Sequence, residues 1–416
     1  MPVVTPRFIV PVVMAIALAI STAPARSIDA ATVDDTARFL AGLQPPSNSP
    51  LAALTKDPTW LSHARYFDSV FAREESTHLS KVREFSKAYL TEKHDTMLYM
   101  FSGPDFLYAN SFFPNASIYV LAGLEPVGEI PDLTALSPWA IDEELRNLES
   151  SMDTLFSFSF FITSKMKTQL HEGPVYGTLP VLYVFLARTG KTIHDVNFGR
   201  LDEQGIFQIA ENRSATKSSS RSGASGAEIV FSEGNGPRQV LYYFSTNLAD
   251  GSVERSGFST FLAKLGPSDS LIKSASYLLH SGHFASVRKL LLDNSATIVQ
   301  DDSGIPLAYF DPREWRLQAF GRYAGPISMF ANFYQPRMAD LFQGASPIEF
   351  GIGYRWRKNE SNLLLAQKGA SPTSDDQLTP NAVATAAPSP KSRKRAETEA
   401  TRSLGCRIAR VFPFCW

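Results

Sequence analysis

The sequence predicts an α/β or α+β protein with a mixed, partly parallel sheet flanked by helices. Three observations support this fold class. Segments with apolar residues every three or four positions alternate with short, continuous apolar runs. Two of these runs, near residue 100, are separated by about a dozen residues, enough for a crossover helix between parallel strands. The second half is rich in β-prone segments separated by glycine-containing turns, which predicts antiparallel hairpins there.

The chain after residue 30 begins with two helical segments and then two strands. Residues 31–43 and 59–90 carry apolar side chains at spacings of three and four, which puts an apolar stripe on each helix. The period then changes, because Thr96–Ser102 and Ala116–Ala122 are continuous apolar runs with the length of buried strands. A short helix between them would make the two strands parallel.

Two further helices are expected before residue 190. Pro138 stands at a first helical position, where its missing N–H costs nothing, and Asp142 and Glu143 follow where the helix dipole favours anions. A second helix is predicted over residues 176–188 and ends at Gly190.

From residue 192 onward, β-prone runs predict strands. The turn Glu233–Arg238 is glycine-rich and lies between two such runs, which predicts a hairpin. The serine-rich segment 211–226 has few apolar residues and is expected to be a mobile surface loop. The predicted strands are Thr192–Phe198, Ile206–Ala210, Ala227–Ser232 and Gln239–Phe244.

Helices return after residue 257. We expect helices over 258–265, 270–279 and 284–294, and Gly282 between the last two predicts an αα-hairpin. The remaining predictions are a strand at 297–300, a turn at 301–304, a short apolar segment at 307–310, a strand near 316–320, a helix near 336–342 and a final hairpin over 349–366.

The N-terminus predicts a secretory signal peptide over residues 1–25. Arg7 precedes the apolar run Phe8–Ile20, and Ala23 and Ala25 are the small residues of an A-x-A cleavage site. The alternative is an uncleaved anchor, but the run is shorter than the roughly 20 residues that cross a bilayer. We therefore expect a periplasmic or secreted protein with no transmembrane span after signal cleavage.

The C-terminal residues 369–416 predict a disordered tail, because serine, threonine, proline, alanine and charged residues replace the apolar pattern. Cys406 and Cys415 are the two cysteines of the chain, and in an oxidising compartment we expect them to form a disulfide. The basic run Lys391–Arg395 and the aromatic residues near the end suit contact with an anionic membrane surface. A solubilising tail without a target is the alternative.

Charge and organisation exclude some classes of partner. Forty basic and forty-one acidic residues leave a formal charge of −1, so the chain has no overall field that attracts nucleic acid.

We expect a helical and parallel-strand part over 31–190 and a mixed α+β part over 191–368, which could form one domain. No cofactor motif is evident.

The strongest candidate site follows the first predicted strand. Ser102–Asp105 would form the turn at the carboxyl end of that strand, where open α/β sheets bind their ligands. Asp105 could act as a general base or bind a ligand hydroxyl, and Tyr108 and Asn110 would lie nearby. The second strand ends before Glu125, which is expected at the same edge. We therefore predict Asp105, Tyr108, Asn110 and Glu125 as ligand-binding residues, with Asp105 and Glu125 as catalytic candidates.

A purely structural explanation stands beside this one. Asp105 could cap the following helix by accepting a backbone N–H, and the neighbouring aromatic residues could belong to the core.

Other polar motifs are weaker. His280 and His283 lack the H-E-x-x-H pattern and a further identifiable ligand, so no metal site is predicted. Asp301 and Asp302 lie in a segment whose composition is that of an ordinary turn. No G-x-S-x-G motif occurs, so the usual nucleophile elbow is absent.

Two segments resemble those of exported bacterial proteins with no assigned activity. They are FSGPDFLYANSFFPNASIYVLAGLEPVG and IVQDDSGIPLAYFDPREW. The resemblance covers the body of the chain from Tyr99 to Trp356 but not the tail, and it carries over no catalytic residue.

Together these features predict an exported soluble protein that binds a small molecule or envelope glycan at the carboxyl edge of its sheet. One alternative is a periplasmic or secreted hydrolase that uses Asp105 or Glu125 as general acid or base, joined through the fold by Asp301, Asp302 or His283. Another is a structural envelope protein whose aromatic surface contacts another protein.

Overall fold

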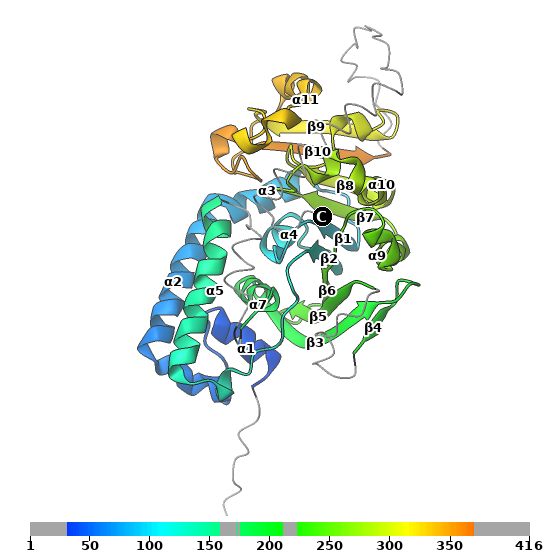
Figure 1. Ribbon diagram of the computed structural model, residues 1–416. Helices are drawn as coiled ribbons and strands as arrows, with labels where there is room; N and C mark the ends of the chain where they lie inside the picture. Colours follow the sequence, from blue (N-terminus) through cyan, green and yellow to red (C-terminus); the bar gives the residue numbers. More distant parts are fainter. Residues whose placement is uncertain (1–30, 159–172, 174, 211–222, 370–416) are drawn as a thin grey trace, which may run out of the picture.

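A computed structural model of the chain describes residues 31–158, 173, 175–210 and 223–369 (Figure 1). The predicted signal peptide over residues 1–25, most of the serine-rich segment 211–226, and the tail after residue 369 lie outside the described residues. Cys406 and Cys415 lie outside them too.

The described residues form a ten-stranded mixed sheet with the strand order β4-β3-β5-β6-β2-β1-β7-β8-β10-β9 (Figure 1). The predicted α/β class is therefore confirmed. The strands are β1 (Thr96–Met100), β2 (Ile118–Gly123), β3 (Lys191–Leu201), β4 (Phe207–Ile209), β5 (Ser225–Glu233), β6 (Arg238–Ser245), β7 (Ser268–Ile272), β8 (Ser295–Gln300), β9 (Trp315–Gly321) and β10 (Asn362–Lys368).

The centre of this sheet is parallel and its two flanks are antiparallel. Strands β6, β2, β1, β7 and β8 pair in parallel, so their carboxyl ends meet at one edge. Beyond β6 the sheet continues through β5, β3 and β4, and beyond β8 through β10 and β9, all by antiparallel pairing. The predicted parallel pair β1–β2 and the predicted hairpin β5–β6 are both confirmed.

Two apolar cores cover the two faces of the sheet. Successive side chains of a strand point to opposite faces, so Met97 and Tyr99 of β1 enter one core, and Leu98 and Met100 enter the other. Figure 1 shows the corresponding helices on the two sides of the sheet. The first core takes α1 (Val33–Leu40), α2 (Pro58–Glu74), α3 (Ser80–Tyr89), α4 (Phe106–Phe112), α5 (Pro138–Phe158) and α7 (Leu179–Arg188), and the second takes α8 (Ser252–Arg255), α9 (Phe258–Lys264), α10 (Ala285–Asn294) and α11 (Pro336–Leu341).

The predicted helix over residues 59–90 is continuous but not uniform. Asp57 caps α2, because its Oδ1 accepts the backbone N–H of Thr59 at 2.8 Å, and Pro58 occupies the first turn. A π-helical turn, η2 (Glu75–Leu79), then joins α2 to α3. Such turns are rare and often lie beside functional sites.

Three predictions in the second half were wrong. Residues 270–279 contain the end of strand β7 and the 3-10 turn η5 (Leu278–His280), not a helix. The αα-hairpin is therefore absent, and His283 lies in a second 3-10 turn, η6 (Gly282–Phe284). The segment 349–366 is not a hairpin, because β10 pairs with the distant strands β8 and β9.

None of the described helices combines the length and the apolar character that crossing a membrane requires.

Candidate functional site

The order of the strands places a switch point between β1 and β7. The chain passes from β1 through α4 to β2 on one side, and from β7 through α10 to β8 on the other. Because α4 packs in the first core and α10 in the second, the two crossovers leave on opposite faces of the sheet. In open α/β sheets, a ligand crevice lies outside the carboxyl ends of the strands at such a point.

Unusual backbone conformations gather at this point. The described residues other than glycine that have positive φ are Phe101 (61°), Ser274 (53°), Ser276 (52°) and Tyr277 (55°). Phe101 follows β1 and the other three follow β7. Each such residue costs about 1–3 kcal/mol and persists only where the surroundings enforce it. This strain is concentrated on the two loops that flank the switch point.

A buried ion pair joins the same two loops. Lys273 Nζ lies 2.8 Å from Asp105 Oδ2, and the two side chains are 1% and 2% exposed. Tyr99 Oη donates to the same carboxylate oxygen at 3.0 Å, and the backbone N–H of Tyr108 donates to Oδ1 at 3.2 Å. The Lys273 ammonium also lies 3.5 Å from the centre of the Tyr108 ring, which adds a cation–π contact.

Burial shifts the pKa values of Lys273 and Tyr99 in opposite directions. It lowers the pKa of Lys273, while the Asp105 carboxylate opposes part of that shift. Burial also raises the pKa of Tyr99 well above its ordinary value, and Asp105 adds to the effect. Tyr99 is therefore a neutral hydrogen-bond donor to the carboxylate.

Two further carboxyl groups approach from the end of β8. Asp301 Oδ1 accepts from the Ser303 hydroxyl at 2.5 Å, and its Oδ2 accepts from the backbone N–H of Ser274 at 3.0 Å. Asp302 Oδ2 accepts from Tyr277 Oη at 2.7 Å. Burial and the neighbouring Asp301 raise the pKa of Asp302 to about 7. These bonds hold the β7 loop, residues 273–277, in its strained conformation.

Two buried polar atoms in this region have no hydrogen-bond partner among the described residues. They are Ser274 Oγ and His280 Nε2. Burial, reinforced by Arg288, lowers the pKa of His280 to about 4, so its ring is neutral at pH 7. Because a buried polar atom without a partner is costly, each calls for an explanation.

We use the name switch-point cluster for the polar residues that meet around the ends of β1, β7 and β8. Its members are Tyr99, Asp105, Tyr108, Lys273, Ser274, Tyr277, His280, Asp301 and Asp302.

Asp105 and Tyr108, two of the four residues predicted from sequence, belong to this cluster. Asp105 also caps α4 by accepting the Tyr108 N–H, so the structural explanation for this residue is confirmed, while its role in ligand binding stays a prediction. Tyr108 contributes its ring to Lys273 rather than to an open surface, since its side chain is buried.

Glu125 reaches the same edge but contacts different residues. It is 4% exposed, and its Oε2 accepts from Tyr243 Oη at 3.4 Å. A Cβ atom on Gly103 would lie 3.6 Å from that oxygen, and one on Gly123 only 2.4 Å, so the Gly123 position must lack a side chain. Glu125 therefore packs against the turn that carries Asp105, and it has no ion-pair partner in the described part of the chain.

Asp301 and Asp302, which the hydrolase alternative included, belong to the cluster, whereas Asn110 and His283 lie elsewhere. Asn110 points from the far end of α4 toward Tyr119 Oη, at 3.5 Å, and lines a separate groove. His283 is exposed in η6. The sequence reasoning missed Lys273 and Ser274, because it assigned them to a helix. A lysine directly after the short apolar pair Leu271–Ile272 was the available signal.

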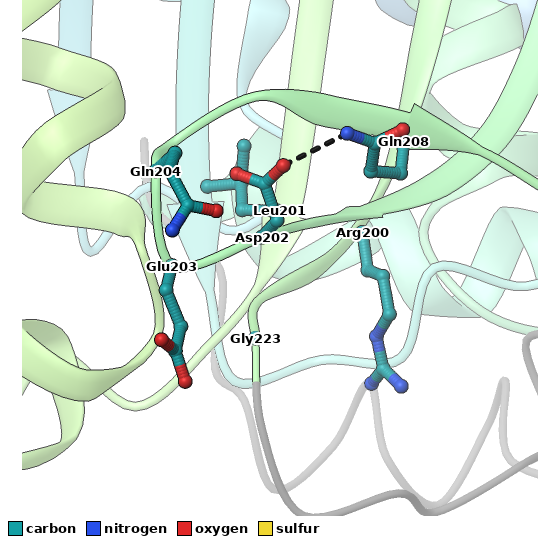
Figure 2. Close-up of a pocket in the computed structure, with 7 residues that line it drawn as sticks. All are labelled: Arg200, Leu201, Asp202, Glu203, Gln204, Gln208 and Gly223. Carbon is teal, nitrogen blue, oxygen red and sulfur yellow. Dashed lines mark hydrogen bonds between the residues drawn. The ribbon is translucent and has the colours of Figure 1, made fainter.

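A hollow of about 370 Å³ lies at the turn between β3 and β4 (Figure 2). Its carboxylate is committed to the turn, because Asp202 accepts from the backbone N–H of Ile206 and from Gln208 Nε2, each at 2.8 Å. Figure 2 shows Arg200 and Glu203 extending away from this bonded pair. None of the residues that line this hollow belongs to the switch-point cluster.

The acidic residues do not suggest a metal centre. Within the described ranges, no group of three or more His, Cys, Asp or Glu side chains is arranged to hold a metal ion.

Comparisons with protein-family models, with curated proteins and with solved structures find no match for this chain.

Proposed function

We propose that this protein binds a small polar molecule at the switch-point cluster. One observation carries the proposal: the positive-φ residues of the described chain converge on two loops that also bury the Lys273–Asp105 pair. Strain and buried charge both reduce stability, and their coincidence at a topological switch point is typical of a ligand site. The unpartnered Ser274 Oγ supports the same reading, because a ligand could satisfy it.

The charges favour a neutral or cationic ligand rich in hydrogen-bond donors, such as a sugar or an amino sugar. Asp105, Asp301 and Asp302 meet there with one ammonium group, from Lys273, and Glu125 lies beside the same turn. Carboxylates accept hydrogen bonds from hydroxyl and ammonium groups, whereas an excess of them repels an anion. An envelope glycan meets this description.

Entry of such a ligand requires the β7 loop to move. Lys273, Asp301 and Asp302 are almost fully buried in the structure. Three of the five residues in the loop have positive φ, so part of the energy needed to displace it is already present as backbone strain. We therefore propose that residues 273–277 open when the ligand binds.

A hydrolase at the same site is the second candidate. It is favoured by Asp302, because a carboxyl group with a pKa of about 7 is suited to general acid or base catalysis near neutral pH. In that case Asp302→Asn would remove turnover of a bound glycoside or ester while retaining most of its binding.

The binding proposal is tested by thermal shift on the full chain with glucosamine, N-acetylglucosamine and glucose, with glucose 6-phosphate as the anionic comparison. We expect a neutral or cationic sugar to raise the melting temperature more than the phosphate does. At pH 8, where most of the Asp302 carboxyl group is ionised, Asp302→Asn should weaken binding about tenfold or more, because a hydrogen bond to a charged group is lost.

The matched control is Asp311→Asn, at a half-buried carboxylate that binds the exposed Arg313 in a turn. It should leave sugar binding unchanged. If no sugar shifts the melting temperature, or if Asp302→Asn binds as the native protein does, the proposal is wrong.

We also propose that the protein is exported and then works in the periplasm or outside the cell. The support is the Arg7 and Phe8–Ile20 pattern, followed by Ala23 and Ala25. N-terminal sequencing of the exported product should begin at Arg26. A product that retains Met1, or that stays inside the cell, would contradict the proposal.

A further inference from the structure

A groove of about 510 Å³ lies on the face of the sheet covered by α2, α3, α4 and α7, and none of its lining residues belongs to the switch-point cluster. Its wall is built from α2, the π-helical turn η2, α3, α4, the end of α7, the start of β3 and the end of β5. Its apolar lining comes from Phe71, Leu79, Leu107 and Pro114. The size is that of an ordinary small-molecule site.

Three cations line this groove, and each is paired with an acid that is more exposed than itself. The exposed fractions of the side chains are 2% for Lys191 against 68% for Glu233, and 8% for Arg188 against 65% for Asp68. The third pair, Arg83 with Glu75, shows the same order at 41% against 51%. Lys191 and Arg188 therefore belong to the wall of the groove, whereas the three acids and the more exposed Arg83 belong to its rim.

Arg188 is the most firmly held of the three. Its Nε donates to the backbone carbonyl of Ala41 at 2.7 Å, and its guanidinium lies 5.3 Å from the centre of the Phe71 ring. Nη1 donates to Asp68, while Nη2 is buried without a hydrogen-bond partner in the described residues. Nη2 lies against Gly42, so a carboxylate or phosphate in the groove would bind at Nη1 in place of Asp68.

The exposed acids are weak partners. An ion pair with a solvated carboxylate contributes about 0–1 kcal/mol, because water and salt screen it. Glu233 and Asp68 can therefore turn into solvent when a stronger anion reaches the cations. Lys191 and Arg188 are buried and therefore stay in the wall of the groove.

We propose that this groove binds a small organic anion, with its charged group on Arg188 and Lys191 and its apolar part against Phe71, Leu79 and Leu107. Asn110 and Ser111 of α4, which also line the groove, supply polar contacts for the same ligand. This site is independent of the proposed sugar site, because it has the opposite charge preference and shares none of the residues of the switch-point cluster.

The test is calorimetric titration of the full chain with octanoate, with octylamine as the matched ligand of opposite charge and inorganic phosphate as an anion without an apolar part. We expect saturable binding of octanoate that weakens as NaCl is added, and weaker binding of phosphate. Octylamine should not bind. Equal binding of octanoate and octylamine, or no saturable binding of octanoate, would overturn the proposal.

Two variants at one ion pair sharpen this test. Lys191→Met should weaken octanoate about tenfold, because it removes a cation from the wall. Glu233→Gln should strengthen octanoate binding, because it removes the competing carboxylate while leaving an exposed side chain that folding does not need. A structural role for the pair predicts no gain, so a Glu233→Gln protein that binds octanoate more weakly than the native chain contradicts the proposal.

The control pair is Lys289 and Asp293 on α10, which are joined at 2.5 Å and exposed at both ends. Lys289→Met and Asp293→Asn should leave octanoate binding unchanged. A change of the same size in these variants would mean that octanoate responds to net charge alone, and the groove would then have no special role.

Discussion

Two buried lysines of this protein, Lys273 and Lys191, differ most clearly in the exposure of the acid that each of them contacts. Both ammonium groups are withdrawn from water and both contact a carboxylate. The partner of Lys273 is Asp105, which is as buried as the lysine, whereas the partner of Lys191 is Glu233, which is exposed. Because Asp105 is buried, Lys273 keeps it as a fixed partner. Because Glu233 is exposed, a bound anion can replace it as the partner of Lys191.

The largest expected effect is the loss of the buried pair. Lys273→Met leaves the Asp105 carboxylate buried without its cation, which should lower the free energy of unfolding by about 3–5 kcal/mol. Urea unfolding measures this directly. The double variant Lys273→Met with Asp105→Asn removes both charges and should recover part of the loss. A double variant no more stable than Lys273→Met would show that the charge of Asp105 is not the cause.

The pH dependence of stability should show the next largest effect, and Asp302 and His280 contribute to it with opposite sign. The pKa of Asp302 rises from 3.8 to about 7, so between these pH values the folded state holds a proton that the unfolded state has lost. Its contribution to stability therefore falls as pH rises. The pKa of His280 drops from 6.5 to about 4, so the unfolded state holds the extra proton, and stability rises with pH over that range.

Each group alone contributes a slope of at most about 1.4 kcal/mol per pH unit. The two slopes oppose each other between about pH 4 and 6.5 in the native chain. Asp302→Asn should make the dependence on pH more positive, and His280→Gln should make it more negative, in urea unfolding at pH 4.5, 5.5 and 6.5. Shifts of the same sign in both variants would mean that the cluster does not titrate in this way.

Relief of backbone strain should give a smaller effect. Ser274 has a φ of 53° and a buried hydroxyl without a partner, so Ser274→Gly should raise stability by about 1 kcal/mol. The same variant should bind sugar less well if the hydroxyl contacts the ligand. As control, Ser259→Gly in the first turn of α9 should lower stability, since glycine disfavours a helix and the Ser259 hydroxyl donates to the Val253 carbonyl. A less stable Ser274→Gly protein would show that the hydroxyl is satisfied in solution.

The smallest effect is expected at the second lysine. Lys191→Met keeps the buried side-chain volume and removes a pair whose acid is solvated, so unfolding should change by less than about 1 kcal/mol. Comparison with Lys273→Met under the same conditions tests the contrast between the two lysines. A loss equal to that of Lys273→Met would remove the distinction.

Local signals in the sequence were enough for several elements. The continuous apolar runs and the turn Ser102–Asp105 predicted β1, α4 and β2, because a buried parallel strand needs apolar residues on both faces. Pro138 predicted the start of α5. These elements are specified by residues within a few positions of each other.

Long-range pairing could not be read in the same way. Strand β7 is five residues long and includes Ser268, Asp269 and Ser270, all buried, so it shows neither alternation nor an apolar run. The apolar residues around and after its end repeat at three and four positions and imitate a helix. Because residues 270–279 were expected to be helical, the contact between Lys273 and Asp105 could not be predicted. That contact requires β7 to lie beside β1.

The position of strand β10 in the sheet constrains the order in which the strands can pair during synthesis. It follows β8 and β9 in the chain but lies between them, and it provides the ladder of β9 along its whole length. Until the ribosome has released residue 368, both earlier strands have open hydrogen-bonding edges and this flank cannot close. The parallel centre of the sheet can therefore pair before this flank does, and the flank is the last part of the sheet to form.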